Sequence, residues 1–358
     1  GRQVTNSTAG LTPARPRLEQ PPPPGHLPPG YAPNGSGGGA AVAPAGAAVT
    51  PAPKVLFKEK WAEKSERIRR SSPAGHMPGW RLLPVIIKSN DDLRQEAFAA
   101  QLIQAMARIL RAAYGDAIWI KDYTIVATDA EAGVIEAVPD TVSIDALKRN
   151  DPHYTNLDDF FHRYFKGPDA ADAASSAKPT PTLNEAKMNF VRSLAPYCII
   201  CYLLNLKDRH NGNILLDAWG HICHIDFGFL FMSSPGGNLN FESAPFKLTD
   251  EMVELMGGPR SHLFNRFREL CVKSFLELRR HSHQVTLLVD MMAHDGHSDL
   301  PCWQGRSHEA AELFRRRFRP DLSEGAAISY VHGLIDAATG NWRTRWYDKY
   351  QRCALGIF

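Results

Sequence analysis

The sequence contains few cysteines, almost no net charge and no long apolar run, and each absence excludes a class of protein. Its six cysteines are scattered through 358 residues without a dense disulfide framework, which favours reduced thiols in an intracellular, cytoplasmic protein. The formal net charge of +3 is too small to indicate nucleic-acid binding. Because no run reaches the roughly 20 apolar residues that span a bilayer, any membrane contact is expected to be peripheral.

Residues 1–53 are expected to form a disordered Pro/Gly/Ala-rich linker. They hold 12 of the chain's 26 prolines and one aromatic residue, Tyr31, so they cannot bury enough apolar surface to offset the entropy of ordering. The chain begins with Gly1 instead of Met, which suggests a fragment of a longer protein.

Strand patterns come first in the remaining chain, and helix patterns follow. Strands are expected at 81–88, 117–120, 123–128 and 134–138. A helix is expected after Asp91, because Leu93, Ala97, Ala100, Ile103 and Leu110 recur at helical spacing. Helices dominate after residue 183, apart from two short strands near 214–224. This order predicts an α+β fold of two lobes, a small mixed lobe over residues 54–138 and a mainly helical lobe over 139–358.

The densest group of polar residues lies between these two parts. The stretch Lys207-Asp208-Arg209-His210-Asn211-Gly212-Asn213 precedes a strand-turn-strand pattern, and Asp226-Phe227-Gly228 follows it. Phosphoryl transfer needs a group near the attacking hydroxyl, ligands for Mg²⁺ and cations on the phosphates. Asp208 or His210 supplies the first, and the sequence does not divide the base role between them. The oxygens of Asn213 and Asp226 suit Mg²⁺.

Two neighbouring features have simpler interpretations. Asp217 is expected to belong to the hairpin turn and not to a metal site. Cys198 and Cys201 form a C-x-x-C pattern, but they lie in an apolar helical stretch without partner ligands, so they are expected in the core.

The combination of D-R-H-N-G-N with I-D-F-G-F resembles the lipid kinases and related kinases, in which D-R-H replaces the H-R-D of protein kinases. The stretch K-S-N-D-D-L-R-Q-E from Lys88 to Glu96 resembles the phosphatidylinositol 4-kinases, as do the residues near Ser233 and Lys247, and the type III beta group in particular. The resemblance extends from about Trp61 to Phe358 and implies a protein-kinase-like fold that uses ATP with Mg²⁺, or Mn²⁺ as an alternative.

The resemblance also implies roles for individual residues. Lys88 is expected on the ATP phosphates, oriented by Asp92 or Glu96. The segment from Ser71 to Trp80 takes the place of the phosphate-covering loop, where Ser72 is expected to donate to a phosphate, although no G-x-G-x-x-G occurs. Ile135, Glu136 and Val138 are expected in the hinge that holds adenine.

The segment after D-F-G indicates the substrate. Phe229, Ser233, Ser234 and Lys247 are expected in the activation segment, and no Lys or Arg occurs from Phe229 to Phe246. A phosphorylated inositide would need additional cations, so unphosphorylated phosphatidylinositol fits better. The resemblance, and not the residues, implies the 4-hydroxyl.

The C-terminal stretch from Trp342 to Phe358 combines aromatic and basic residues, which suits either a membrane interface or packing against the helical lobe. Trp342, Trp346 and Tyr350 are the expected membrane contacts. The resemblance implies intracellular membranes such as the Golgi and recruitment by adaptor proteins.

Two other functions are compatible with parts of this sequence pattern. An inositide-kinase-like protein kinase shares the D-R-H and D-F-G motifs, but the C-terminal residues lack the tryptophan- and phenylalanine-rich tail of that group. An inactive scaffold is disfavoured because no essential motif residue is substituted. Since the family has further N-lobe strands and a helical domain, this chain alone is expected to be poorly stable and weakly active.

Overall fold

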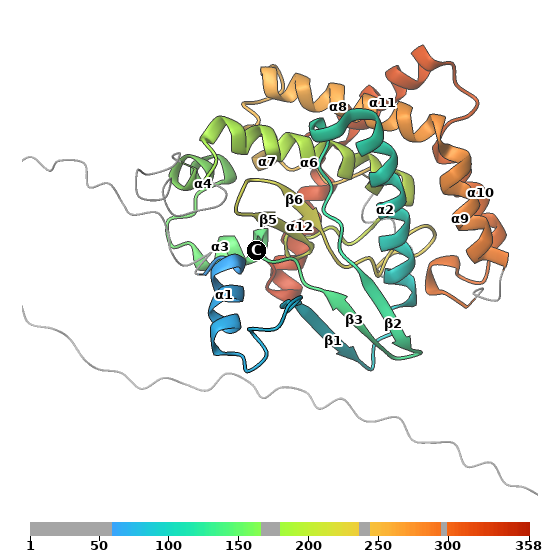
Figure 1. The fold of residues 1–358 in the computed structure, drawn as a ribbon. Coiled ribbons are helices and arrows are strands. Elements are labelled where there is room, and N and C mark those ends of the chain that lie inside the picture. The colour runs from blue at the N-terminus through green and yellow to red at the C-terminus, as the bar shows by residue number, and fades with distance from the viewer. Residues whose placement is uncertain (1–58, 166–179, 236–243, 295–298) are drawn as a thin grey trace, which may run out of the picture. The chain divides into compact units, whose positions relative to one another are not determined.

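The computed structural model describes residues 59–165, 180–235, 244–294 and 299–358. The expected linker at residues 1–53 lies outside these ranges, and its disorder stays a prediction. The described elements form an early part with one small sheet and a later, mainly helical part with a second sheet (Figure 1). The predicted α+β class is confirmed.

The early part consists of a three-stranded antiparallel sheet and one long helix. The strand order is β1-β3-β2, and Ile135 of the central strand lies opposite Ile86 on one side and Ile125 on the other. Helix α2 buries Phe98, Leu102 and other apolar residues along one face. The elements are α1 (Trp61–Ser71), β1 (Val85–Ser89), α2 (Arg94–Tyr114), η1 (Gly115–Ala117), β2 (Ile125–Asp129) and β3 (Ala132–Glu136).

The strand expected at 117–120 is wrong. Ile118 and Ile120 are buried and alternate with less buried neighbours, as in a strand. The amide of Trp119, however, donates to the carbonyl of Arg192 in α6 at 3.0 Å. The segment therefore runs against a helix, where no strand ladder forms.

The later part is built around α6, which is buried along most of its length (Figure 1). A second antiparallel sheet has the order β4-β5-β6. The elements are β4 (Thr141–Ser143), α3 (Ile144–Asn150), α4 (Leu157–Tyr164), α6 (Leu183–Leu204), η2 (Asn211–Asn213), β5 (Ile214–Asp217), β6 (Ile222–His224), α7 (Asp250–Leu255), α8 (His262–Arg280), α9 (Ser282–His294), η3 (Pro301–Trp303), α10 (Ser307–Arg317), α11 (Glu324–Ala338) and α12 (Trp342–Leu355).

Helix α6 begins with a capping box, in which Thr182 and Glu185 bond each other's backbone amides. Cys198 and Cys201 are 2% exposed on this helix, which confirms that they are core residues. Asp217 accepts from the amides of Trp219 and His221 at 2.8 Å each, so its predicted place in the hairpin turn is also confirmed.

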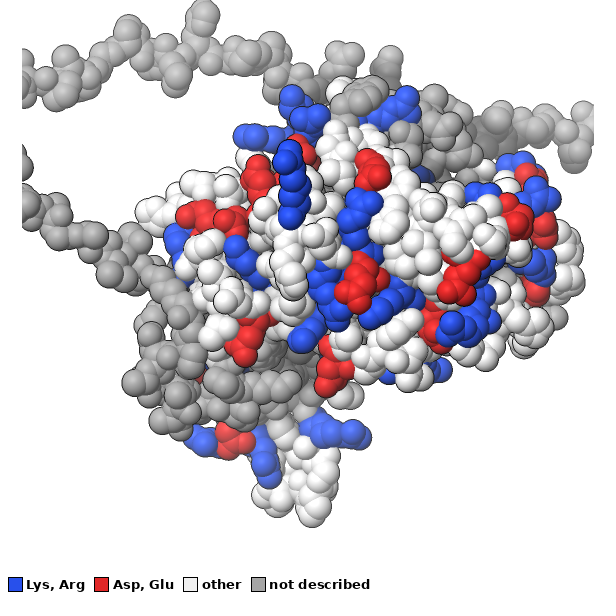
Figure 2. Space-filling model, turned by 90° about the horizontal axis from the view of Figure 1, so that it is seen from above, with Lys and Arg blue, Asp and Glu red and all other residues white. Residues whose placement is uncertain are grey.

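Basic and acidic side chains are interspersed on the face seen in Figure 2. Helices α8 and α11 lie toward this side in Figure 1, and Arg268 of α8 binds Asp336 of α11 at 2.7 Å. On α8 itself, Glu269 pairs with Arg266 and with Lys273, each at 2.6 Å. Such exposed pairs are worth little individually, but they keep the local field small.

Gly220, in the turn between β5 and β6, provides a test of this packing. Its φ is +92°, and an added Cβ would lie 2.7 Å from the carbonyl oxygen of Ala186 in α6. We expect Gly220→Ala to lower the free energy of unfolding by about 1–3 kcal/mol, measured by urea denaturation. Gly333→Ala is the matched control, because Gly333 lies inside α11 with no atom within 4 Å of its added Cβ. The control should be neutral or stabilising. An equal loss of stability in both variants would contradict the close packing of Gly220 against α6.

Candidate active site

The β5–β6 hairpin brings the two motifs together. Asn213 directly precedes β5, and Asp226 follows the end of β6 by two residues. Because Ile214 pairs with His224 in the antiparallel register, the two motif ends meet at the same end of the hairpin. The amide of Ile225 donates to the carbonyl of Asn213 at 3.1 Å, which joins the two segments directly.

Asp208 and Asp226 both adopt left-handed backbone conformations, with φ of 61° and 63°. Residues other than glycine rarely occupy this region, and each instance costs of order 1–3 kcal/mol. Such strain persists only where the surrounding contacts hold it, and it concentrates at functional sites.

Arg209 supplies much of that support. Its buried guanidinium donates to the carbonyls of Lys207 at 2.9 Å, Ile225 at 2.8 Å and Asp226. It also lies over the ring of Phe227, 5.8 Å from the centroid. Arg209 thus fixes the backbone of both motifs.

Gln95 of α2 holds the D-F-G segment from the other side. Its side-chain amide donates to the carbonyls of Phe227 at 3.2 Å and Gly228 at 2.6 Å. Neither Arg209 nor Gln95 is among the site residues expected from the sequence. The sequence indicated a role for them only in that each lies inside a motif that resembles the lipid kinases.

Asn213 and Asp226, the expected metal ligands, lie at the same end of the β5–β6 hairpin. The Asn213 amide nitrogen donates to the Asp208 carbonyl at 3.0 Å, which fixes the Asn213 side chain. The Asp226 residue is exposed, and its carboxylate accepts a long bond from the Gly228 amide, at 3.3 Å. Among the described residues no group of three or more His, Cys, Asp or Glu forms a cation site. Two protein oxygens are nevertheless enough for Mg²⁺, which typically takes its other ligands from water and phosphate.

His210 is fixed in one orientation. Its Nδ1 accepts from the Gly212 amide at 3.1 Å, and its Nε2 lies 3.8 Å from an Asp208 carboxylate oxygen. Burial lowers the pKa of His210, although the Asp208 charge opposes this shift. A neutral ring whose Nδ1 accepts a bond carries its proton on Nε2, on the side of Asp208.

Helix α12 packs directly on the loop that carries Asp208. The Tyr347 hydroxyl donates to the Asp208 carboxylate at 2.5 Å, and Gln351 reaches the same oxygen at 3.4 Å. Lys247, expected in the activation segment, is buried and donates to Asn211 at 2.9 Å and to Asp348 of α12 at 2.6 Å. Tyr347 is a further site residue that was not selected from sequence.

Lys88 lies in β1 and pairs with Asp91 at 3.0 Å, and not with the expected Asp92 or Glu96. Asp92 instead binds Arg94, at 2.8 Å. The hydrogen bond to Asp91 raises the pKa of Lys88, opposed by partial burial and assisted by the charges of Glu96 and Asp226. Lys88, Glu96 and Asp226 therefore share one electrostatic environment.

The expected hinge residues lie in and after β3. The Ala137 amide donates to the Pro84 carbonyl at 2.9 Å, and the Glu136 carboxylate accepts from the Thr124 amide at 3.0 Å. The Val138 carbonyl accepts from Thr141 at 2.7 Å, whereas its amide bonds to no other described residue.

Ser72 and Ser233 each bond within their own loops. Ser72 follows α1, and its hydroxyl accepts from the Ala74 amide at 3.3 Å. The buried Ser233 hydroxyl donates to the Leu230 carbonyl at 2.9 Å. Phe229 accepts from the Lys207 amide at 3.0 Å, so the start of the activation segment is joined to the motif before it. Ser234 directly follows Ser233 in the chain, and residues 236–243 lie outside the described ranges.

Comparisons with known proteins identify the family of the chain. Residues 83–304 match the family described as Phosphatidylinositol 3- and 4-kinase. The chain is 44% identical to phosphatidylinositol 4-kinase beta 1 of Arabidopsis thaliana over 84% of this chain and 26% of the relative. It is 40% identical to phosphatidylinositol 4-kinase beta of Rattus norvegicus over 85% of this chain and 35% of the relative. The chain thus spans between a quarter and somewhat over a third of these curated relatives.

Glu96 should make stability depend on pH. Burial, with the charges of Asp226 and Asp91, raises the pKa of Glu96 from the ordinary 4.5 to about 7. The folded protein therefore binds this proton more tightly than the unfolded chain does. Ionisation of Glu96 destabilises the fold increasingly as pH rises from 4.5 to about 7, with the full effect above that range.

We expect Glu96→Gln to raise the free energy of unfolding by about 1–3 kcal/mol at about pH 8, and to have little effect at about pH 4.5. Thermal melts at both pH values measure the difference. Glu131→Gln, in the exposed turn between β2 and β3, is the control and should not change the pH dependence. If Glu96→Gln raised stability equally at both pH values, the raised pKa of Glu96 would be contradicted.

Proposed function

Because the chain belongs to the phosphatidylinositol 3- and 4-kinase family, we propose that the protein transfers the γ-phosphate of ATP to the 4-hydroxyl of phosphatidylinositol. The product is phosphatidylinositol 4-phosphate, for inositide signalling and membrane trafficking. The observation that carries the proposal is the hairpin that joins Asp208, Asn213 and Asp226 within the residues that match the family. The ring position rests on the names of the relatives.

The nucleotide is held by residues of both parts of the fold. Lys88 binds the ATP phosphates, and Asp91 holds its ammonium in place. Asn213 and Asp226 hold Mg²⁺, with Mn²⁺ as an alternative, and this ion neutralises charge on the phosphates when bound. The backbone amide of Val138, together with Ile135 and Glu136, binds adenine. Ser72 covers the phosphates.

Asp208 and His210 have different roles in this proposal. Asp208 accepts the proton of the inositol hydroxyl, and the bonds from Tyr347 and Gln351 of α12 to one of its oxygens hold the carboxylate in place. His210 donates a hydrogen bond from its Nε2–H to the transferred phosphoryl group, since Nδ1 accepts from the Gly212 amide. Positioning and charge stabilisation account for most of the rate enhancement in this reaction class.

An unphosphorylated inositol ring fits the charge of the activation segment. Phe229, Ser233 and Ser234 carry no positive charge, and the ammonium of Lys247 is paired with Asp348. A ring that already bore phosphates would need free cations beside it.

Helix α12 is proposed to rest on the membrane. Trp346 is 45% exposed and Tyr350 52% exposed, and their rings stack 5.9 Å apart. Arg345 and Lys349 are exposed on the same helix, and Trp342 begins it. None of the described helices is long and apolar enough to cross a bilayer. The proposal extends to the surface of intracellular membranes such as the Golgi and to recruitment by adaptor proteins, both of which the family resemblance implies.

The direct test is incubation of the protein with radiolabelled ATP, Mg²⁺ and phosphatidylinositol vesicles, followed by location of the label on the ring. Label at the 4-position is expected. Label at the 3-position would correct the substrate chemistry, and label on added protein alone would favour a protein kinase. A folded protein that labels neither the lipid nor the added protein would be a scaffold.

Variants in the same assay test the proposed roles. Asp226→Asn and Asp208→Asn should each lower the rate at least about a hundredfold, because they remove a metal ligand and the proton acceptor. Asp336→Asn is the matched control, since Asp336 is exposed on α11, and it should keep the full rate. Full activity in either site variant would rule out the proposed role of that residue.

The membrane contact is tested by vesicle sedimentation. Trp346→Ala combined with Tyr350→Ala should lower binding about tenfold or more, because it removes exposed aromatic surface from α12. Leu287→Ala with Met291→Ala removes comparable exposed apolar surface from α9 and should leave binding unchanged. Equal binding by all three proteins would mean that α12 only packs against the helical part.

A further inference from the structure

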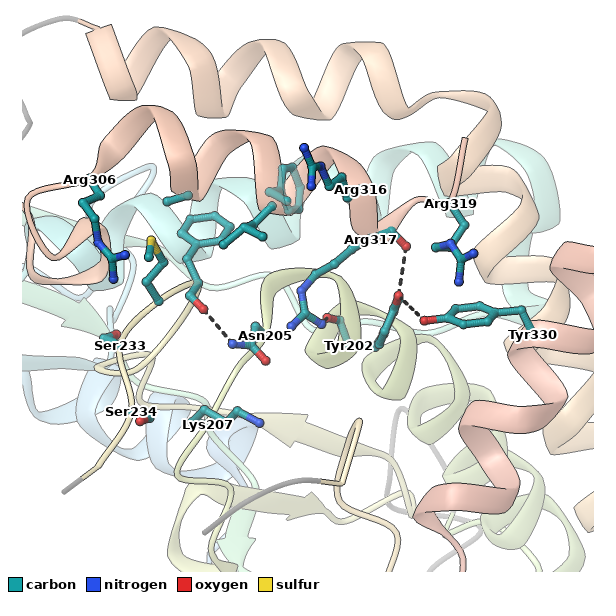
Figure 3. A pocket seen from close by; sticks show the side chains of 15 residues that line it. Tyr202, Asn205, Lys207, Ser233, Ser234, Arg306, Arg316, Arg317, Arg319 and Tyr330 are labelled. Atoms are coloured by element: carbon teal, nitrogen blue, oxygen red, sulfur yellow. Dashed lines mark hydrogen bonds between the residues drawn. The ribbon is translucent and has the colours of Figure 1, made fainter. Parts of the chain in front are cut away.

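A cavity of about 650 Å³ lies between the end of α6, the residues after D-F-G, and helices α10 and α11. None of its 15 lining residues is Asp or Glu. Five are cationic, namely Lys207, Arg306, Arg316, Arg317 and Arg319. Hydroxyl groups of Tyr202, Tyr330, Ser233 and Ser234 also line it. Figure 3 shows Arg306 and Arg316 on one side of the space and Lys207 on the other.

Arg317 is the least compensated of these cations. No carboxylate of the described residues lies within 4.0 Å of its guanidinium, which instead donates to the Tyr202 carbonyl at 2.7 Å. It also lies over the Tyr202 ring, 5.2 Å from the centroid. Burial lowers the pKa of Arg317, but a guanidinium stays charged at neutral pH. A partly desolvated positive charge without a counter-ion favours an anionic ligand.

The other arginines are neutralised only by pairs with exposed carboxylates. Arg306 binds Glu309 at 3.1 Å, Arg316 binds Glu312 at 3.0 Å and Arg319 binds Asp321 at 2.7 Å. These acidic side chains are 48% to 59% exposed and do not line the cavity. Such pairs are weak and readily exchanged, so the arginines can turn to a ligand.

Stabilisation of the helix dipole does not explain the whole set. Arg316 and Arg317 lie in the last turn of α10, where cations are favourable. Arg306, however, precedes the first residue of α10, and Lys207 belongs to the segment after α6. The shared property of the five cations is the cavity that they surround.

We propose that this cavity binds a small polyanion, namely a compact polyol carrying two or more phosphates, either free in solution or as the headgroup of a lipid. Guanidinium groups recognise phosphate oxygens through paired hydrogen bonds. The volume lies within the range of small-molecule sites, and cations on opposite sides match several phosphates. The proposal does not depend on the proposed reaction.

A ligand in the cavity would bridge two segments of the active site. Lys207 directly precedes Asp208, and Ser233 belongs to the start of the activation segment. The two segments are already joined by Asn205, whose side chain donates to the Phe231 carbonyl at 2.6 Å. Occupancy would therefore stiffen the connection between the catalytic loop and the activation segment.

The test measures binding to the full 358-residue chain with two probes. Calorimetric titration with inositol hexakisphosphate tests a soluble source. Sedimentation with phosphatidylcholine vesicles, with and without phosphatidylinositol 4-phosphate, tests a lipid source. Binding of either probe that depends on the cavity arginines supports the proposal and identifies the source.

Arg317→Gln and Arg319→Gln should each weaken binding about tenfold or more, because each removes a charged hydrogen-bond donor. Arg315→Gln is the matched control, since Arg315 lies in the same turn of α10, binds Asp290 and does not line the cavity. The Arg319 side chain is 30% exposed, whereas Arg317 is largely buried, so the Arg319 variant remains informative if Arg317→Gln fails to fold.

Lys88→Met separates this cavity from the reaction site and should leave the affinity unchanged. Loss of binding in Lys88→Met would mean that the probe occupies the nucleotide site, which would overturn the proposal. Absence of binding for both probes, or equal loss in the Arg315→Gln control, would overturn it as well.

Discussion

The buried guanidinium of Arg209 lies between the two segments that carry the site's carboxylates and bonds main-chain carbonyls of both. Its partners in these bonds are carbonyl groups, so its contribution is directional as well as electrostatic. Without such a donor, the partly buried carbonyls of Ile225 and Asp226 would lose this partner, at a cost of up to about 1–3 kcal/mol each. The strained conformations of Asp208 and Asp226, and therefore the metal and proton chemistry proposed for them, depend on this bond set.

The last helix adds a second constraint on the same loop. Tyr347 and Gln351 hold Asp208, while Asp348 holds Lys247 against Asn211. Figure 1 places the C-terminus beside α3, and the Phe358 amide donates to Asp145 of that helix at 2.6 Å. Residues separated by more than a hundred positions thus define one polar network, which a change in α12 would transmit to the proposed reaction centre.

Much of the fold could be predicted from sequence because its signals are local. The apolar spacing of α2, the hairpin turn at Asp217 and the buried cysteines of α6 follow from periodicity and turn chemistry. The segment at 117–120 was predicted wrongly because alternating burial looks the same against a helix as in a sheet. The pairing of Lys88 with Asp91 and the contact of Tyr347 with Asp208 could not be predicted, since each depends on side-chain geometry or on distant packing.

The left-handed backbone of Asp208 and Asp226 has a consequence for genetic reagents. Asparagine tolerates this conformation at least as well as aspartate, whereas a residue such as alanine adds backbone strain. An asparagine allele therefore removes a charge and leaves the loop in place, and an alanine allele perturbs both together. Phenotypes of the two alleles in a cell would distinguish loss of chemistry from loss of a correctly shaped protein.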